Sequence, residues 1–208
     1  RDRAYYAQQR ALSEYDWASL YMGAPRAREG KRFRGSTVYE NAPTEARLAI
    51  GVDFAYSTRA AADWSTAVVL GRTDHRRYVL HVVRRQCSAT EFAGELRGLA
   101  LRYPTARMHA YIGGQEGGIV DLLRTQGVHV VAKPAREDKY TRSLAASEAW
   151  NRGEILLPSQ APWLAAFLGE VLDFSGIADA HDDQVDALVA AFDALGIDSM
   201  SASTRTHQ

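Results

Sequence analysis

An aspartate sits near the end of an otherwise apolar segment, Leu48-Ala-Ile-Gly-Val-Asp-Phe54, which predicts a buried β-strand. Alternate side chains of a strand point to opposite faces, so Asp53 shares its face with the small residues Ala49 and Gly51. A charge on such a face is costly unless it is paired or binds a metal ion. An aspartate that ends the strand and begins the loop at Ala55 explains this segment equally well.

Two more strands are expected directly after this one. Residues 66–71 and 78–83 are rich in β-branched side chains, and the polar residues 74–77 between them predict a turn, as in an antiparallel meander. Helix and strand patterns then alternate. We expect helices at 89–103, 116–126, 137–152, 162–174 and 182–195, and strands at 108–112, 128–132 and 154–157. This order predicts an α/β fold with a mixed central sheet flanked by helices, antiparallel in its first three strands.

The composition divides the chain into three parts. Residues 1–35 are rich in tyrosine and end in a polar, basic run, and we interpret residues 1–44 as a leader and linker. Residues 45–197 form the expected domain, and residues 198–208 form a Ser/Thr-rich tail that we expect to fray. The chain does not begin with methionine, and we interpret it as a fragment of a longer protein.

Composition and missing motifs exclude several classes of protein. The chain holds 25 Lys and Arg and 25 Asp and Glu, so its overall charge does not mark a nucleic-acid binder. A single cysteine, Cys87, excludes a disulfide framework and a multi-cysteine metal site. No apolar run is long enough to span a membrane, and we expect a cytoplasmic protein. Neither dinucleotide-binding nor phosphate-binding glycine motifs are present.

Acidic residues recur at two further places. The segment His181-Asp-Asp-Gln-Val-Asp186 opens the last predicted helix, with Asp183 and Asp186 on the same side. Capping and the helix dipole explain one or two of these acids, but not readily a third. Glu116 lies between two glycine pairs where a strand runs into a helix, which an ordinary first-turn glutamate also explains. We expect the acids to converge at one edge of the sheet.

Such a cluster needs a cation, because neighbouring carboxylates repel one another. A site made only of oxygen donors favours Mg²⁺ or Mn²⁺. Two such ions about 4 Å apart are the usual arrangement for cleavage of a phosphodiester.

The sequence resembles the nuclease domain of large terminase subunits from tailed bacteriophages, a family with the ribonuclease H-like fold. The resemblance covers about residues 48–195. The motifs that carry it, in order, are Ile50-Gly-Val-Asp-Phe-Ala55, Asp63-Trp-Ser-Thr-Ala-Val-Val69, Gly114-Gln-Glu-Gly-Gly-Ile-Val-Asp-Leu-Leu123, Asp138-Lys-Tyr-Thr-Arg-Ser-Leu-Ala145, Asn151-Arg-Gly-Glu-Ile-Leu-Leu-Pro158 and His181-Asp-Asp-Gln-Val-Asp-Ala-Leu188. Residues 1–35 also resemble the stretch that follows a terminase ATPase domain, whose own motifs this sequence lacks.

The resemblance implies an endonuclease of the two-metal type that cuts concatemeric viral DNA during genome packaging. It implies catalytic roles for Asp53, Glu116 and Asp183 with two Mg²⁺ or Mn²⁺ ions. Many members carry the middle acid where this chain has Gly113, so either Glu116 bends back to the metals or the acid set is reduced. The metal-ligand positions that it implies are Asp53, Asp63, Asp183 or its neighbour Asp182, and Asp186.

Three basic residues lie between the fifth strand and the helix after it. We expect Lys133, Lys139 and Arg142 to contact DNA phosphates, which gives affinity without sequence information; a solvated helix face is the alternative. The implied partners are double-stranded DNA and, through the full-length chain, the terminase small subunit and the portal protein. The implied location is the cytoplasm of the bacterial host, without membrane association. The alternatives are another ribonuclease H-like nuclease, such as a Holliday-junction resolvase, and a non-catalytic DNA-binding packaging module.

Overall fold

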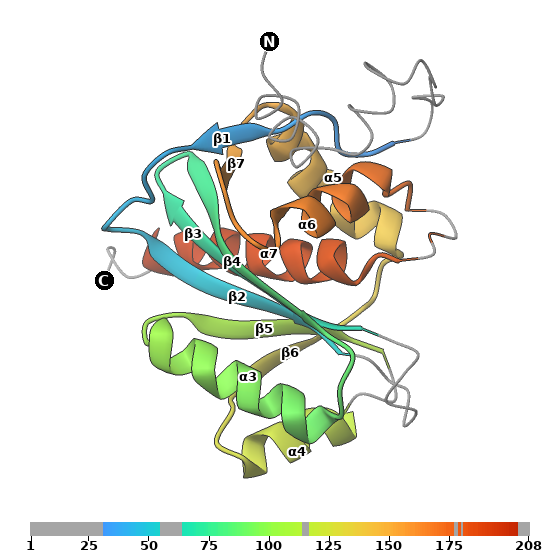
Figure 1. The fold of residues 1–208 in the computed structure, drawn as a ribbon. Helices are drawn as coiled ribbons and strands as arrows, with labels where there is room; N and C mark the ends of the chain where they lie inside the picture. Colours follow the sequence, from blue (N-terminus) through green and yellow to red (C-terminus); the bar gives the residue numbers. More distant parts are fainter. Residues whose placement is uncertain (1–30, 55–63, 114–116, 177–178, 180, 204–208) are drawn as a thin grey trace.

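The computed structural model describes residues 31–54, 64–113, 117–176, 179 and 181–203 (Figure 1). Helices and strands alternate along most of this chain. Its strands are β1 (Thr37–Tyr39), β2 (Arg47–Asp53), β3 (Ser65–Thr73), β4 (Arg76–Arg85), β5 (Arg107–Ile112), β6 (Val130–Pro134) and β7 (Ile155–Pro158). Its helices are α3 (Ala89–Arg102), α4 (Gly117–Thr125), α5 (Lys139–Asn151), α6 (Leu164–Asp173) and α7 (Asp183–Ser203).

The strands form one mixed sheet in the order β1-β7-β4-β3-β2-β5-β6. β2, β3 and β4 are antiparallel neighbours, as predicted, and Asp74 and His75 form the turn between β3 and β4. The remaining neighbours, β1 with β7, β7 with β4, β2 with β5 and β5 with β6, run parallel. The predicted fold class, a mixed α/β sheet that begins with an antiparallel meander, is therefore confirmed.

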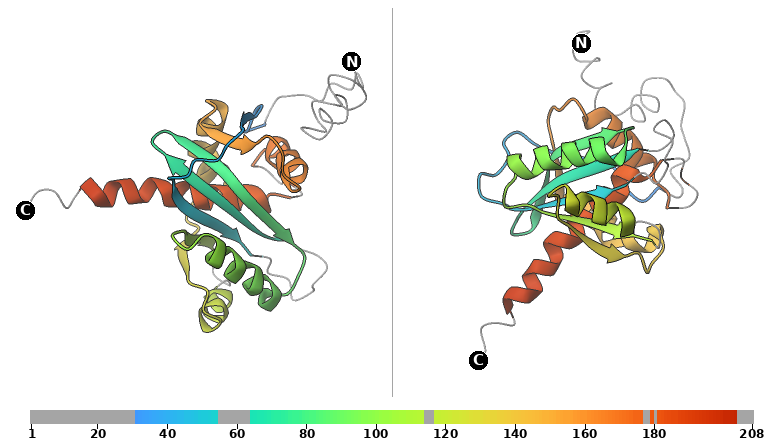
Figure 2. Two further views of the ribbon diagram at one scale, coloured as in Figure 1. Left: turned by 60° about the vertical axis from the view of Figure 1, so that its left-hand side comes forward. Right: turned by 90° about the horizontal axis from the view of Figure 1, so that it is seen from below.

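Helices cover both faces of the sheet, α5, α6 and α7 on one and α3 and α4 on the other (Figures 1 and 2). The alternation in β2 divides its side chains between two hydrophobic clusters. Ala49 packs in the cluster that contains α7, and Ile50, Val52 and Phe54 pack in the cluster that contains α3. Asp53 therefore projects on the α7 face of the sheet.

Gly51 allows α7 to lie directly on β2. A Cβ atom on Gly51 would lie 1.8 Å from the carbonyl oxygen of Ala187 and 2.5 Å from the amide nitrogen of Ala191. The small residues that accompany Asp53 on its strand face thus make room for a helix backbone. This close approach sets the first turn of α7 beside the end of β2.

The described part of the predicted leader packs onto the domain. Phe33 is 1% exposed, and its ring meets that of Trp150 edge-on with centroids 5.6 Å apart. The Trp150 indole donates to the carbonyl of Gly35 over 2.8 Å. Asn151 accepts from the Arg34 amide and donates to the carbonyl at residue 32. Residues 31–44 thus supply a strand and a core side chain, which their basic, polar composition did not indicate.

The last helix is longer than the sequence pattern predicts. α7 continues to Ser203, past the expected end at Leu195 and into the predicted tail, and its C-terminal part extends beyond the sheet (Figure 2). The carbonyl of Leu195 accepts from the guanidinium groups of Arg47 and Arg72, over 3.1 and 2.9 Å. Among the described residues, no helix combines the length and apolar character that a membrane span requires.

Candidate active site

Asp53 belongs to a row of polar side chains that crosses three strands. It lies opposite Thr66 on β3, and Thr66 lies opposite Arg84 on β4, so the three side chains share the α7 face. Thr66 is fully buried, and its hydroxyl has no hydrogen-bond partner among the described residues. Positions 53, 66 and 84 would be apolar in a purely structural core. Here they are polar, and they lie on the face of the sheet that α7 covers.

The acids at the start of α7 act on Asp53 directly. Burial raises the pKa of Asp53 well above its usual range, and the charges of Asp186, Asp183 and Asp182 raise it further against the opposing effect of Lys139. A buried carboxylate with acidic neighbours is unfavourable without a cation. Asp53 therefore lies within electrostatic range of the acids of the last helix, and their binding of a shared metal ion stays a prediction.

Asp183, in the first turn of α7, also has a raised pKa. Burial raises the pKa of Asp183 to about 6, and the charges of Glu170 and Asp182 add to the rise, while Arg84 and Lys139 oppose it. Both acids that the sequence predicts as principal metal ligands thus hold their protons more tightly than free carboxylates. Each would gain from a divalent cation, which favours the ionised form.

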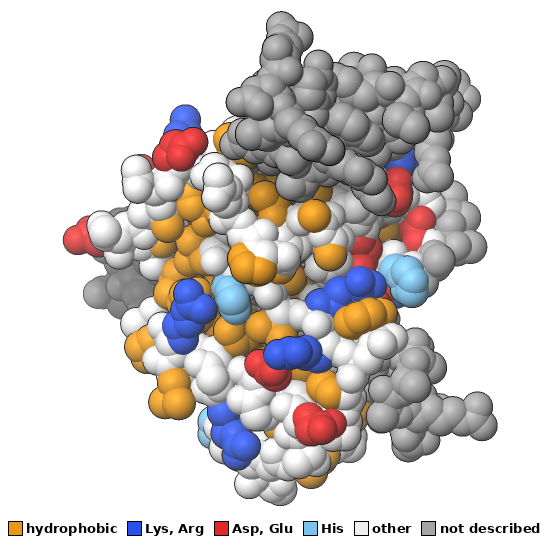
Figure 3. Space-filling view, in the orientation of Figure 1, with side chains coloured by type: hydrophobic (Ala, Val, Ile, Leu, Met, Phe, Trp, Pro, Cys, Tyr) orange, Lys and Arg blue, Asp and Glu red, His pale blue; other side chains and the backbone are white. Residues whose placement is uncertain are grey.

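Asp182 and Asp186 differ from this pair because they already have cationic partners from α5. The Lys139 ammonium lies 2.7 Å from Asp182 and 2.8 Å from Asp186, and Arg142 lies 3.0 Å from Asp186. Burial lowers the pKa of Lys139, but the two carboxylates outweigh it and raise that pKa above its usual range. Acidic and basic side chains gather at this end of α7 in the space-filling view (Figure 3).

These pairs bear on the predicted DNA contacts. The side chain of Arg142 is only 10% exposed, and its guanidinium also lies 5.0 Å from the centre of the Tyr111 ring, which favours a supporting role. Lys139 is 45% exposed, so its contact with DNA stays a prediction. Lys133, on β6, lies close enough to Asp193 to oppose the rise in pKa that burial causes there, and its DNA contact also stays a prediction.

Glu170 is a buried acid that the sequence analysis missed. Its carboxylate accepts from the backbone amide and the side-chain amide of Gln184, over 2.6 and 2.7 Å, and lies 3.2 Å from Arg84. It therefore ties α6 to the first turn of α7 and sets the position of that turn. The available signal was its spacing, because Glu170 adjoins Val171 and follows Phe167 by three residues on the buried side of the helix.

The type of donor suits a hard divalent cation, but the metal site stays a prediction because part of it lies outside the described residues. Asp63 and Glu116 both fall in segments that the structure does not describe. Within the described ranges, no three His, Cys, Asp or Glu side chains form a group that could hold a metal ion. Asp53 and Asp183 supply carboxylate oxygens, the donors that Mg²⁺ and Mn²⁺ prefer.

Removing the Asp183 charge should change how stability depends on pH. Because the pKa of Asp183 is about 6 in the folded protein and near 3.8 when exposed, the folded state holds more protons between these values. Stability of the metal-free protein should therefore fall as pH rises from about 4 to 6. Asp183→Asn should remove about 1–2 kcal/mol of this fall, allowing for solvent screening. Urea unfolding in a chelator at several pH values measures it, and equal slopes in both proteins would contradict it.

Comparison with known proteins identifies the family. A family model described as the terminase RNase H-like domain matches residues 50–195, which include Asp53 and the acids of α7. This chain belongs to that family. The resemblance noted from the sequence is therefore confirmed. The mixed sheet with helices on both faces agrees with the ribonuclease H-like fold of this family.

Solved terminase structures share the fold. The large terminase nuclease from the thermophilic phage G20c is 21% identical, with a TM-score of 0.59 over 77% of this chain and 89% of that chain. Its magnesium-bound form is 20% identical, with a TM-score of 0.60 over 77% and 88%. The large terminase of a second thermophilic bacteriophage is 12% identical, with a TM-score of 0.60 over 93% of this chain and 53% of that one. A search of curated proteins found no match.

Proposed function

We propose that this terminase domain is a metal-dependent endonuclease that cuts concatemeric viral DNA during genome packaging. The observation that carries the proposal is the position of Asp53, at the end of β2 beside the acids of α7, with a raised pKa. A structural role gives no reason to gather these carboxylates, whereas a phosphodiester hydrolase needs them. The related G20c nuclease, solved with magnesium, zinc and cobalt, supports a divalent metal.

Asp53 and Asp183 would hold Mg²⁺ or Mn²⁺, with Asp63 and Glu116 as the proposed remaining donors for two ions. Bound there, the metal would polarise the phosphodiester and lower the pKa of an attacking water. Glu170 accepts from the Gln184 amide and so fixes the first turn of α7, which carries Asp183.

The α5 cations have a separate part in this proposal. Lys139 and Arg142 neutralise Asp182 and Asp186, which limits the negative charge that a DNA phosphate meets at the site. Lys139 and Lys133 are the proposed contacts to the phosphates of double-stranded DNA.

The wider setting is proposed from the family. Residues 1–44 would lead from an ATPase domain. The full-length chain would work with the terminase small subunit and the portal protein in the cytoplasm of the bacterial host.

Cleavage of supercoiled plasmid by the purified chain tests the activity. We expect nicked and linear products with Mg²⁺ or Mn²⁺ and none with a chelator, because the carboxylates alone supply no nucleophile or Lewis acid. A four-way DNA junction added as competitor distinguishes a terminase nuclease from a Holliday-junction resolvase. A resolvase would cut the junction in preference to the plasmid. Binding without cleavage under every metal condition would instead support a non-catalytic packaging module.

A further inference from the structure

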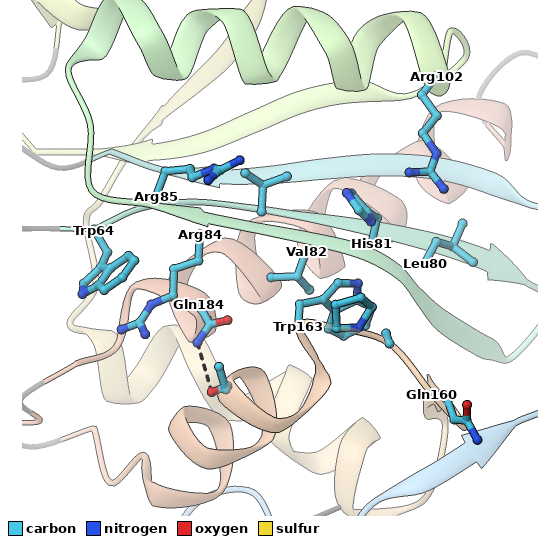
Figure 4. A pocket seen from close by; sticks show the side chains of 14 residues that line it. Trp64, Leu80, His81, Val82, Arg84, Arg85, Arg102, Gln160, Trp163 and Gln184 are labelled. Carbon is cyan, nitrogen blue, oxygen red and sulfur yellow. Dashed lines mark hydrogen bonds between the residues drawn. The ribbon is translucent and has the colours of Figure 1, made fainter. Parts of the chain in front are cut away.

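A groove runs along the edge of β4 that faces away from β3, where the second half of the strand has no neighbour among the described residues. β7 pairs with β4 only at Arg77 and Tyr78, so the strand from Leu80 to Arg85 has no partner strand on that side. The groove has a volume of about 800 Å³ and lies between β4, the end of α3 and the start of α6 (Figure 4). It shares only Arg84 and Gln184 with the acidic site described above.

The lining combines basic side chains with aromatic surface. Its polar and aromatic side chains are Trp64, His81, Arg84, Arg85, Arg102, Gln160, Trp163 and Gln184, and no Asp or Glu is among the described residues that line it. Arg84 pairs with Glu170 and Arg85 with Glu95, each over 3.2 Å, so a DNA phosphate would have to compete with these carboxylates. Trp64 and Arg84 lie at one end of the groove and Arg102 at the other, with Trp163 between them (Figure 4). Tryptophan rings between cations are the elements with which proteins hold unpaired bases and the backbone that joins them.

One end of the groove meets the acidic site. Gln184 lines the groove and directly follows Asp183 in α7. Arg84 lies 4.2 Å over the Trp64 ring and opposes the rise in the pKa of Asp183. A DNA strand with a phosphate at Asp53 and Asp183 can therefore continue past Arg84 into the groove.

We propose that this groove binds single-stranded DNA next to the cut, which rests on the proposed nuclease function. The strand from Leu80 to Arg85 spans about 17 Å, enough for a few nucleotides. Arg85 and Arg102 would contact phosphates, and bases would stack on Trp64 and Trp163. An unpaired strand edge also suits a peptide, but the positive lining and the continuity with the acidic site favour DNA.

Two double variants with equal charge loss test the groove. Arg85→Gln with Arg102→Gln removes two groove cations, whereas Arg97→Gln with Arg124→Gln removes two exposed cations elsewhere. Binding of a fluorescein-labelled oligothymidylate is measured by anisotropy in a chelator at several salt concentrations. The groove variant should bind more weakly, with a salt slope smaller by about 0.7 for each lost contact. The control should keep the wild-type slope.

Photocross-linking gives a second readout that does not depend on charge. An oligonucleotide carrying 5-iododeoxyuridine should cross-link to Trp64 or Trp163, as identified by mass spectrometry of the peptides. Wild-type affinity and slope in the groove variant, with cross-links only elsewhere, would overturn the groove proposal. So would an oligoglutamate peptide that binds through Arg85 and Arg102 while the oligothymidylate does not. Because these assays contain no metal, plasmid cleavage still tests the nuclease function separately.

Discussion

Asp53→Asn should lower the rate of metal-dependent plasmid cleavage by at least about 100-fold. Loss of outer partners of a metal ligand already costs about 10–100-fold in affinity or activity, and Asp53 is proposed as a direct ligand. The fold should remain intact. Because burial and the α7 acids disfavour the Asp53 charge, the metal-free variant should be more stable than the wild type at neutral pH.

The measurements are the rate of plasmid nicking in Mn²⁺ and the unfolding midpoint in a chelator. Asp121→Asn is the matched control, because Asp121 is an exposed acid on α4 whose partner is Arg124. It should leave both quantities close to those of the wild type. Undiminished nicking by purified Asp53→Asn protein would exclude Asp53 from the catalytic machinery.

Gly51→Ala should cost more than about 3 kcal/mol of stability, near the upper end of overpacking effects. The added Cβ would overlap the backbone of α7 at Ala187 and Ala191, and a helix backbone cannot move aside as a flexible side chain can. Relief requires α7 to shift away from β2. Such a shift would also carry Asp183 away from Asp53, so cleavage should fall together with stability.

Gly98→Ala on α3 is the control for this substitution. Beyond the backbone of its own helix turns, no atom lies within 4 Å of a Cβ built on Gly98, and alanine is the better helix former, so stability should rise by about 0.5–1 kcal/mol. Urea unfolding and plasmid nicking of the two variants provide the comparison. Equal stability of the two variants would show that α7 does not depend on the glycine contact.

The sequence predicts the parts of the fold and site that local pattern determines. Alternation in residues 48–54 places Asp53 opposite the apolar face of β2, and the acids beginning at Asp182 mark the start of α7. β-branched runs identify β3 and β4, and the polar turn between them determines their antiparallel pairing. Each of these signals lies within about ten residues of sequence, the range over which periodicity and turn chemistry act.

Features that depend on distant packing could not be predicted in this way. In the sequence, Glu170 is an ordinary helix residue. Its role follows only from the packing of α6 on α7, where it accepts a hydrogen bond from the Gln184 side chain. Lys139 and Arg142 look like free cations until α5 meets α7 and pairs them with its acids. β1 has only three residues and forms because β7 offers it an edge, which no local pattern encodes. Local sequence therefore identifies the acidic residues of the candidate site, whereas tertiary contacts determine the residues that support them.

The attachment of the leader has a mechanical consequence. Asn151 holds the backbone on both sides of Phe33, and Asn151 is the last residue of α5. The first turn of the same helix carries Lys139, which forms ion pairs with Asp182 and Asp186 at the start of α7. The thirteen residues of α5 form a helix about 20 Å long, which separates these two attachments. Tension applied to the chain ahead of Phe33 would therefore reach α5, and with it the helix turn that holds the carboxylate cluster, as well as the end of α6, where the Arg32 amide donates to the Phe174 carbonyl.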